Sequence, residues 1–240
     1  MKKKYLLLVL LAGFGLTSCD NEPEPDPLPD VARSYCTLYN FLMEPVHVNW
    51  EVDDIKVEGE HVYGSVVQGG VLLEEETEQI SFVVKNAASG EIIESLLIEM
   101  TENRNYQGII FGTLENPVFL LRQVDTSPPE SGNIRVQFLH ATASLDSLDV
   151  YLGGTTLQKR VISGIDYTEL SEYTQVSEYD IRASVIITPH DTIFNPGNEL
   201  ISFKYNDQIQ VNNNYLTVIA PSGSSPLSPP TLWLYAQPID

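Results

Sequence analysis

The side chains whose types and spacing best suit chemistry are His140 and Asp149, on two neighbouring predicted strands. An aspartate beside a histidine can orient the imidazole for proton transfer. Residues 141–147, which join them, carry hydroxyl groups but no glycine-flanked nucleophile of the kind that hydrolases use. A hairpin brings two such side chains close in any case. We therefore interpret His140 as a structural residue that hydrogen-bonds the turn.

The other histidines and the acidic runs predict no metal site and no cofactor. His47, His61 and His190 are scattered, without the spacing of a zinc motif. The runs Glu74–Glu78 and Asp53–Asp54 offer ligands to Ca²⁺, but they lack the spacing of a calcium-binding loop. We interpret these carboxylates as a solvated acidic face. A hydrolase that uses two carboxylates across a cleft remains an alternative, because their separation cannot be taken from sequence.

Three tyrosines form the candidate binding surface. Tyr167, Tyr173 and Tyr179 recur every six residues, so on one extended strand they would share a face. Such a row could stack on sugar rings or on a partner protein. A turn near Ser177 would instead direct some of the rings into the core. The long loop 221–230 is a second candidate, either as a binding loop or as a connector.

The charge of the chain excludes nucleic acid as a partner. With 13 basic and 33 acidic side chains, the formal net charge is 13 − 33 = −20. A polyanion would be repelled, and the sequence has no basic stripe that could follow a phosphate backbone.

The first residues predict a membrane-anchored lipoprotein of the bacterial cell envelope. Residues 1–18 combine a basic start with a short apolar run, as in a secretory signal peptide. Leu16-Thr17-Ser18-Cys19 resembles a lipobox, which implies lipidation of Cys19 and the membrane as a partner. The acidic, proline-rich residues 19–32 predict a disordered tether. Sequence leaves open whether the protein faces the periplasm or the cell surface. With Cys19 lipidated, Cys36 has no disulfide partner, and we place it as a buried strand residue.

The rest of the chain predicts an all-β fold with two tandem immunoglobulin-like β-sandwiches. Runs rich in Val, Ile, Phe and Tyr alternate with turn residues, and even the helix-compatible segment 91–99 has flanks that favour a strand. Residues 37–54 align on 137–154 without gaps, and Asn103–Tyr106 matches Asn212–Tyr215. We therefore predict domain 1 at 33–124, a linker at 125–132 and domain 2 at 133–240. We expect the halves to fold separately and to hinge at the linker.

The second half resembles a known family. Ile134–Ala141 and Leu148–Gly154 resemble the opening of the domain of unknown function 4397, and Tyr173–Ile181 and Asn214–Ile219 resemble its later elements. The resemblance extends weakly to residues 34–123, where Asn40 and Asn49 stand in place of the family's histidine and aspartate. It implies an exported, lipid-anchored β protein and supplies no catalytic residue.

These features together predict a non-catalytic, lipid-anchored envelope protein that presents loops or sheet edges to a protein or glycan. Two alternatives stay open. One is an envelope carbohydrate-active hydrolase that uses acidic residues, and the other is a purely structural spacer.

Overall fold

The computed structural model describes residues 32–44, 46–192, 199–205, 209–225 and 227–239. The predicted signal peptide, Cys19 and nearly all of the predicted tether lie outside these residues. Regular structure is almost entirely β, apart from α1 (Glu178–Ala183) and a 3-10 turn, η1 (Leu157–Lys159). No helix in the described part of the chain has the length and apolar character to cross a bilayer. The predicted all-β fold is confirmed.

The first half forms a sandwich of two four-stranded sheets, with strand orders β4-β1-β7-β8 and β3-β2-β5-β6. Its strands are β1 (Arg33–Leu42), β2 (Val48–Val52), β3 (Ile55–Lys56), β4 (Val66–Leu72), β5 (Thr77–Asn86), β6 (Ile92–Thr101), β7 (Asn105–Gly112) and β8 (Pro117–Gln123). The segment that suited either a helix or a strand lies in β6, as predicted.

The second half repeats this arrangement strand for strand, with orders β12-β9-β15-β16 and β11-β10-β13-β14. Its strands are β9 (Asn133–His140), β10 (Leu148–Leu152), β11 (Arg160–Ile165), β12 (Thr174–Ser177), β13 (Val185–Pro189), β14 (Ile201–Phe203), β15 (Asn214–Pro221) and β16 (Pro230–Gln237). In each half the first strand pairs in parallel with the seventh, β1 with β7 and β9 with β15.

The repeated asparagine motif marks one tight turn in each half. Asn103 and Asn212 both have left-handed backbone, with φ of 58° and 61°. Their N–H groups donate to the carbonyl oxygens of Arg33 and Asn133, at 2.7 and 2.8 Å. Asparagine tolerates this conformation better than most residues with a side chain. The sequence match therefore reflects a shared backbone requirement.

The tyrosine of the same motif fixes the turn to the sandwich. The Tyr106 hydroxyl accepts a hydrogen bond from the Thr101 N–H at 2.8 Å. In the second half, the Tyr215 hydroxyl accepts from the Gln210 N–H at 2.7 Å. A buried tyrosine that bonds backbone a few residues upstream is a recurring anchor of β-sandwiches.

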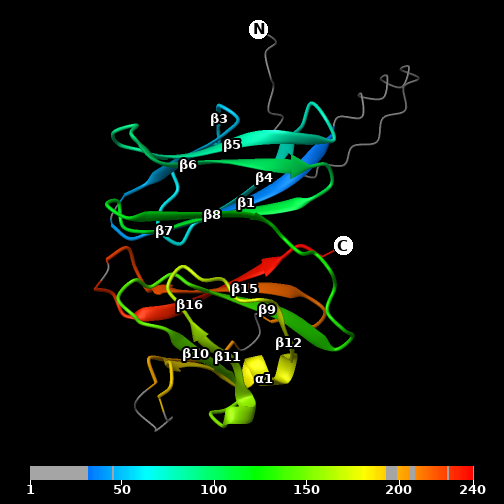
Figure 1. Cartoon of the computed structure of the whole chain (residues 1–240), viewed down its shortest axis with the longest axis vertical. Coiled ribbons are helices and arrows are strands. Elements are labelled where there is room, and N and C mark those ends of the chain that lie inside the picture. Colours follow the sequence, from blue (N-terminus) through cyan, green and yellow to red (C-terminus); the bar gives the residue numbers. More distant parts are fainter. Residues whose placement is uncertain (1–31, 45, 193–198, 206–208, 226, 240) are drawn as a thin grey trace, which may run out of the picture.

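Strand alternation divides the apolar side chains between two sandwich cores and a third cluster. On β1, Cys36 and Leu38 point into the first core, which also buries Trp50. The second core buries Phe138 and Val150 in the same way. The opposite faces of the inner sheets meet in the third cluster, whose members are Tyr39, Phe41, Ile109, Phe111, Leu139, Ala141, Leu216, Val218 and Ala220. The molecule is therefore a stack of four β layers (Figure 1).

Aromatic contacts and hydrogen bonds hold the two halves in one arrangement. Phe41 lies edge-on to Trp233, with ring centroids 5.6 Å apart. The Tyr63 hydroxyl donates to the Pro221 carbonyl oxygen at 2.6 Å, so the end of β15 is bound to the first half. Gly64 lies so close to Trp233 that an added Cβ would stand 2.8 Å from the indole. These contacts specify how the inner sheets meet.

This interface differs from the hinge that the sequence led us to expect. Strand β8 ends at Gln123 and β9 begins at Asn133, so the intervening segment does connect the halves. However, separating the halves would expose the buried aromatic side chains of the third cluster to water, which is unfavourable. Prolines such as those of the linker cannot continue a strand ladder, but they carry no information on the sheet faces that pack beside the linker.

Candidate functional site

The candidate site is built on the part of the first half's inner sheet that the second half leaves uncovered. The register places Tyr35 between Gly70 of β4 and Asn105 of β7. Thr37 lies beside Gln68 of β4, one row further along. Because alternate β1 residues face away from the first core, Tyr35 and Thr37 share the outer face with the third cluster.

These residues line an open groove of about 430 Å³. Its lining consists of Tyr35, Cys36, Thr37, Gln68, Gly69, Gly70, Asn105 and, from the second half, Pro238. Tyr35 is 54% exposed, which is high for a tyrosine on a sheet face. A Cβ added at Gly70, the residue opposite Tyr35, would meet only the Ser34 carbonyl oxygen, at 3.9 Å, so this glycine leaves the groove unfilled beside the ring.

The groove offers stacking and neutral hydrogen bonding. Tyr35 supplies an aromatic face, while Thr37, Gln68 and Asn105 supply hydroxyl and amide groups. None of the lining residues is an aspartate, glutamate, lysine or arginine. This combination resembles a ligand site in which an aromatic surface carries the contact area and a few polar groups fix orientation.

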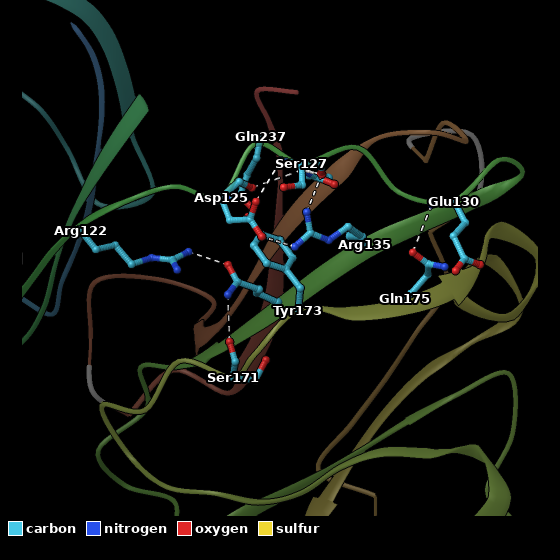
Figure 2. Close-up of polar contacts among 11 residues, drawn as sticks. Arg122, Asp125, Ser127, Glu130, Arg135, Ser171, Tyr173, Gln175 and Gln237 are labelled. Carbon is cyan, nitrogen blue, oxygen red and sulfur yellow. Dashed lines mark hydrogen bonds and ion pairs between the residues drawn. The ribbon is translucent and has the colours of Figure 1, made fainter. Parts of the chain in front are cut away.

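A buried cluster of amides lies next to the groove, between the two halves. Gln107, the β7 neighbour of Thr37, accepts from Arg122 Nη2 at 2.9 Å. The same Arg122 atom donates to Gln137 Oε1 at 2.5 Å, and Figure 2 shows Arg122 reaching across from the first half. Gln237 Nε2 also donates to Gln107 Oε1, at 2.8 Å. Burial lowers the pKa of Arg122, because a guanidinium loses hydration there.

The corresponding surface of the second half is covered by the linker (Figure 2). Arg135 forms an ion pair with Asp125 and donates to the Ser127 carbonyl oxygen. Asn214 Nδ2 donates to that same carbonyl oxygen at 3.0 Å. Hydrogen bonds from Arg135 and Ser127 hold the pKa of Asp125 well below its usual range. The linker is thus bound to the sheet through its own oxygens.

The three predicted tyrosines do not form one platform. Tyr167 lies edge-on to Phe111 at the interface, with ring centroids 6.1 Å apart. Tyr173 lies under the Arg135 guanidinium, 4.1 Å from the ring centroid, and its hydroxyl donates to Gln237. Only Tyr179 is fully exposed, on α1.

The reason is the turn that the sequence analysis had weighed. Ser177 caps α1, accepting the Asp180 N–H at 3.1 Å, so the strand ends before Tyr179. A period of six therefore spans a loop, a strand and a helix, and the tyrosines face different surroundings.

His140 is buried and makes two local hydrogen bonds, one of which matches a hydrogen bond of Asn40 in the first half. Its Nδ1 accepts the Thr142 N–H at 3.3 Å, as Asn40 Oδ1 accepts the Leu42 N–H at 2.9 Å. Its Nε2 lies 3.1 Å from the Asp146 carbonyl oxygen. Burial lowers the pKa of His140, which favours the neutral ring. These contacts support the structural interpretation.

Asp149 pairs with His190 rather than with His140. The buried Asp149 carboxylate lies 2.8 Å from His190 Nδ1, accepts the Gly164 N–H at 2.9 Å and contacts Arg160 at 3.1 Å. Asp149 lies at an irregularity in the β10–β11 pairing, where the register shifts between Leu148 and Val150. The sequence analysis chose the nearer histidine in the chain, but strand pairing brings in the one that follows β13.

Of the remaining predicted features, only Cys36 is among the residues that line the groove. Among the described residues, no three His, Cys, Asp or Glu side chains are placed to hold a metal ion. Glu75 and Glu76 are exposed. His47 pairs with Glu60 at 2.9 Å. Cys36 is buried as predicted, and burial raises the pKa of its thiol.

The chain matches no protein-family model and no curated protein, but it has distant likenesses among solved structures. A family 41 carbohydrate-binding module from streptococcal virulence factors, described for α-glucan recognition, is 14% identical with a TM-score of 0.27, covering 77% of this chain and 93% of its own. A second streptococcal α-glucan-binding structure is 12% identical with a TM-score of 0.28, covering 77% and 92%.

The family 26 module CBMbc of Eubacterium rectale Amy13K, solved with maltoheptaose, is 9% identical with a TM-score of 0.24, covering 87% and 98%. These likenesses are too distant to transfer the role of any residue. The groove must therefore be understood from its own side chains.

The groove residues were not singled out from sequence. Tyr35, Asn105 and Gly70 are far apart in the chain, and only the register of β1 with β4 and β7 brings them into one row. One signal was available. The Gly69-Gly70 pair interrupts the apolar segment that forms β4, and glycine inside a strand marks a place that another molecule can approach closely.

Proposed function

We propose that this protein is a non-catalytic module of the bacterial cell envelope that binds a glycan in the groove of its first half. The observation that carries the proposal is the exposed Tyr35 ring, set among neutral hydrogen-bonding side chains in a groove of about 430 Å³. A pyranose ring presents an apolar face to an aromatic ring and hydroxyl groups to amides. The groove offers both kinds of partner.

The same lining argues for binding rather than hydrolysis. Glycosidases of the usual kind place two carboxyl groups on either side of the scissile bond. The residues that line the groove include no carboxylate. A sugar bound there would lack both an acid and a nucleophile.

Binding should depend on Tyr35. In a glycan screen with the purified protein, Tyr35→Ala should weaken binding of any captured glycan at least about tenfold, the loss expected for about 1.4 kcal/mol of contact. Tyr179→Ala is the matched control, because that ring is 81% exposed on α1 and lines no part of the groove. Gly70→Gln, which imitates Gln175 of the second half, should also weaken binding by filling the groove. Equal loss in the control, or none in Tyr35→Ala, would refute the site.

Anchoring through Cys19 is the second part of the proposal. It is supported by the lipobox-like residues that end at Cys19 and by the proline-rich segment that follows. Replacing Cys19 with Ala should leave unprocessed precursor that takes up no lipid label. Metabolic palmitate labelling that persists in that variant would contradict the anchor.

A further inference from the structure

The second half contains a surface equivalent to the groove, and there the structure shows which segment covers it. Arg135 pairs with Gln175 of β12 and with Asn214 of β15, just as Tyr35 pairs with Gly70 and Asn105. The covering segment is the linker (Figure 2). It serves as a template for how this surface holds a chain that crosses it.

The linker is held by three kinds of contact. Its carbonyl oxygens accept from Asn214 Nδ2, at 3.0 Å from Ser127 and 3.5 Å from Asp125. The Asp125 carboxylate pairs with Arg135. The Glu130 N–H donates to Gln175 Oε1 at 3.2 Å. The surface thus uses an amide donor and the Arg135 guanidinium for neutral carbonyl oxygens, and the same guanidinium pairs with the one carboxylate.

The first half keeps the amide and loses the guanidinium. Asn105 occupies the position of Asn214, and its side chain makes no hydrogen bond to another described residue. Tyr35 occupies the position of Arg135, so stacking replaces recognition of a carboxylate. Gly70 replaces Gln175, which leaves open space beside the ring.

The charge of the whole chain acts in the same direction. Twenty more acidic than basic side chains give a field that repels anions. A ligand carboxylate in the groove would meet this field without a facing cation, because no charged residue lines the groove.

We infer that the groove selects an uncharged glycan over one that carries carboxylates, with Asn105 donating to a ligand oxygen and Tyr35 stacking on a sugar ring. This inference rests on the proposed glycan binding and names the class of glycan. Tyr35 is the specificity-determining residue, because it replaces the cation that the same surface carries in the second half.

The test compares neutral hexose oligosaccharides with uronate oligosaccharides of equal length, by calorimetry on the full chain. The wild-type protein should bind the best neutral ligand at least tenfold more tightly than the best uronate. Tyr35→Arg, which installs the chemistry of Arg135, should reverse that preference. Tyr179→Arg adds the same charge away from the groove and should leave the preference unchanged. Asn105→Ala should weaken binding about tenfold, whereas its counterpart Asn214→Ala should not.

The possible failures are distinct. Uronate binding that equals or exceeds neutral binding in the wild-type protein overturns the inference and leaves glycan binding intact. A peptide of the linker sequence, residues 125–130, is offered in the same assay. If it binds the groove and no glycan does, both the inference and the proposed function are wrong, and the groove is a peptide receptor. The melting temperature of Tyr35→Arg is measured as a control. A value equal to that of the wild-type protein shows that a lost preference does not result from unfolding.

Discussion

The two halves share a strand order and a register, yet the same surface is open in the first half and covered in the second. The difference lies in a few side chains. In the second half Arg135 and Gln175 hold the linker, and Tyr173 lies under Arg135. The first half has Tyr35, Gly70 and Gln68 at these three positions. The backbone elements around them are equivalent. Under the proposed function, the two halves would separate a structural role from a binding role by differences among the residues on one sheet face.

The residues common to both halves have a different character. Asn103 and Asn212 hold a left-handed turn, and Tyr106 and Tyr215 anchor it. Buried polar positions also correspond, as with Asn40 and His140.

The largest expected effect concerns the cluster that joins the halves. Phe41→Ala should cost about 3–5 kcal/mol of unfolding free energy, because Phe41 is 1% exposed and packs against aromatic rings from both halves. Denaturant unfolding followed by Trp fluorescence measures the loss. Tyr179→Ala should cost less than about 0.5 kcal/mol and serves as the control. If Phe41→Ala leaves the unfolding free energy unchanged, packing between the halves contributes little to stability and each half is stable without the other.

The second effect compares His140 with its counterpart Asn40. His140→Ala should cost about 1–3 kcal/mol, because it leaves the buried Thr142 N–H without its acceptor. His140→Asn, which imitates the first half, should fold and recover most of that loss. Thermal melts at pH 7 distinguish the two variants. Loss of ligand binding in His140→Asn without a change in melting temperature would instead reveal a chemical role.

Features that depend on the local sequence pattern could be predicted, whereas features that depend on which strands pair could not. Alternation of apolar residues marks buried faces, so the β fold, the repeat and the buried Cys36 were predictable. The pairing of His190 with Asp149 was not, because it depends on an irregularity in the β10–β11 pairing and on which strand lies next to β10. The interface was missed for a similar reason. A strand buried on both faces has the same composition whether the second face meets a sheet of its own domain or of its neighbour.

The third effect concerns the matched turns. Asn103→Ala and Asn212→Ala should each cost about 1 kcal/mol, because alanine is strained at positive φ. Asn103→Gly and Asn212→Gly should be nearly neutral, since glycine has no such penalty. Chemical denaturation of the four variants measures the costs. If the loss of unfolding free energy differs clearly between the halves, the two turns share a backbone conformation but contribute differently to stability.

The smallest expected effect depends on pH and exists only in the second half, where Asp149 replaces Asn49. The hydrogen bond from His190 to Asp149, together with the nearby carboxylates, raises the pKa of His190 above its ordinary value of 6.5. A histidine with a raised folded-state pKa stabilises the protein fully below its unfolded pKa, and the contribution is lost as pH rises through the folded value.

His190→Gln keeps a donor for Asp149 and removes the titration. The wild-type protein should therefore be more stable than His190→Gln at pH 5, and the difference should shrink steadily toward pH 9, as measured by urea unfolding at several pH values. In an Asp149→Asn background, which imitates the first half, the same substitution should show a much smaller trend, because the carboxylate that contributes most to the raised pKa is gone and only the exposed Asp191 remains. A difference that stays constant from pH 5 to pH 9 would show that the Asp149–His190 contact does not depend on the charge of the ring. In that case the replacement of Asn49 by Asp149 would change the geometry of the contact at the halves' equivalent positions, but not the pH dependence of stability.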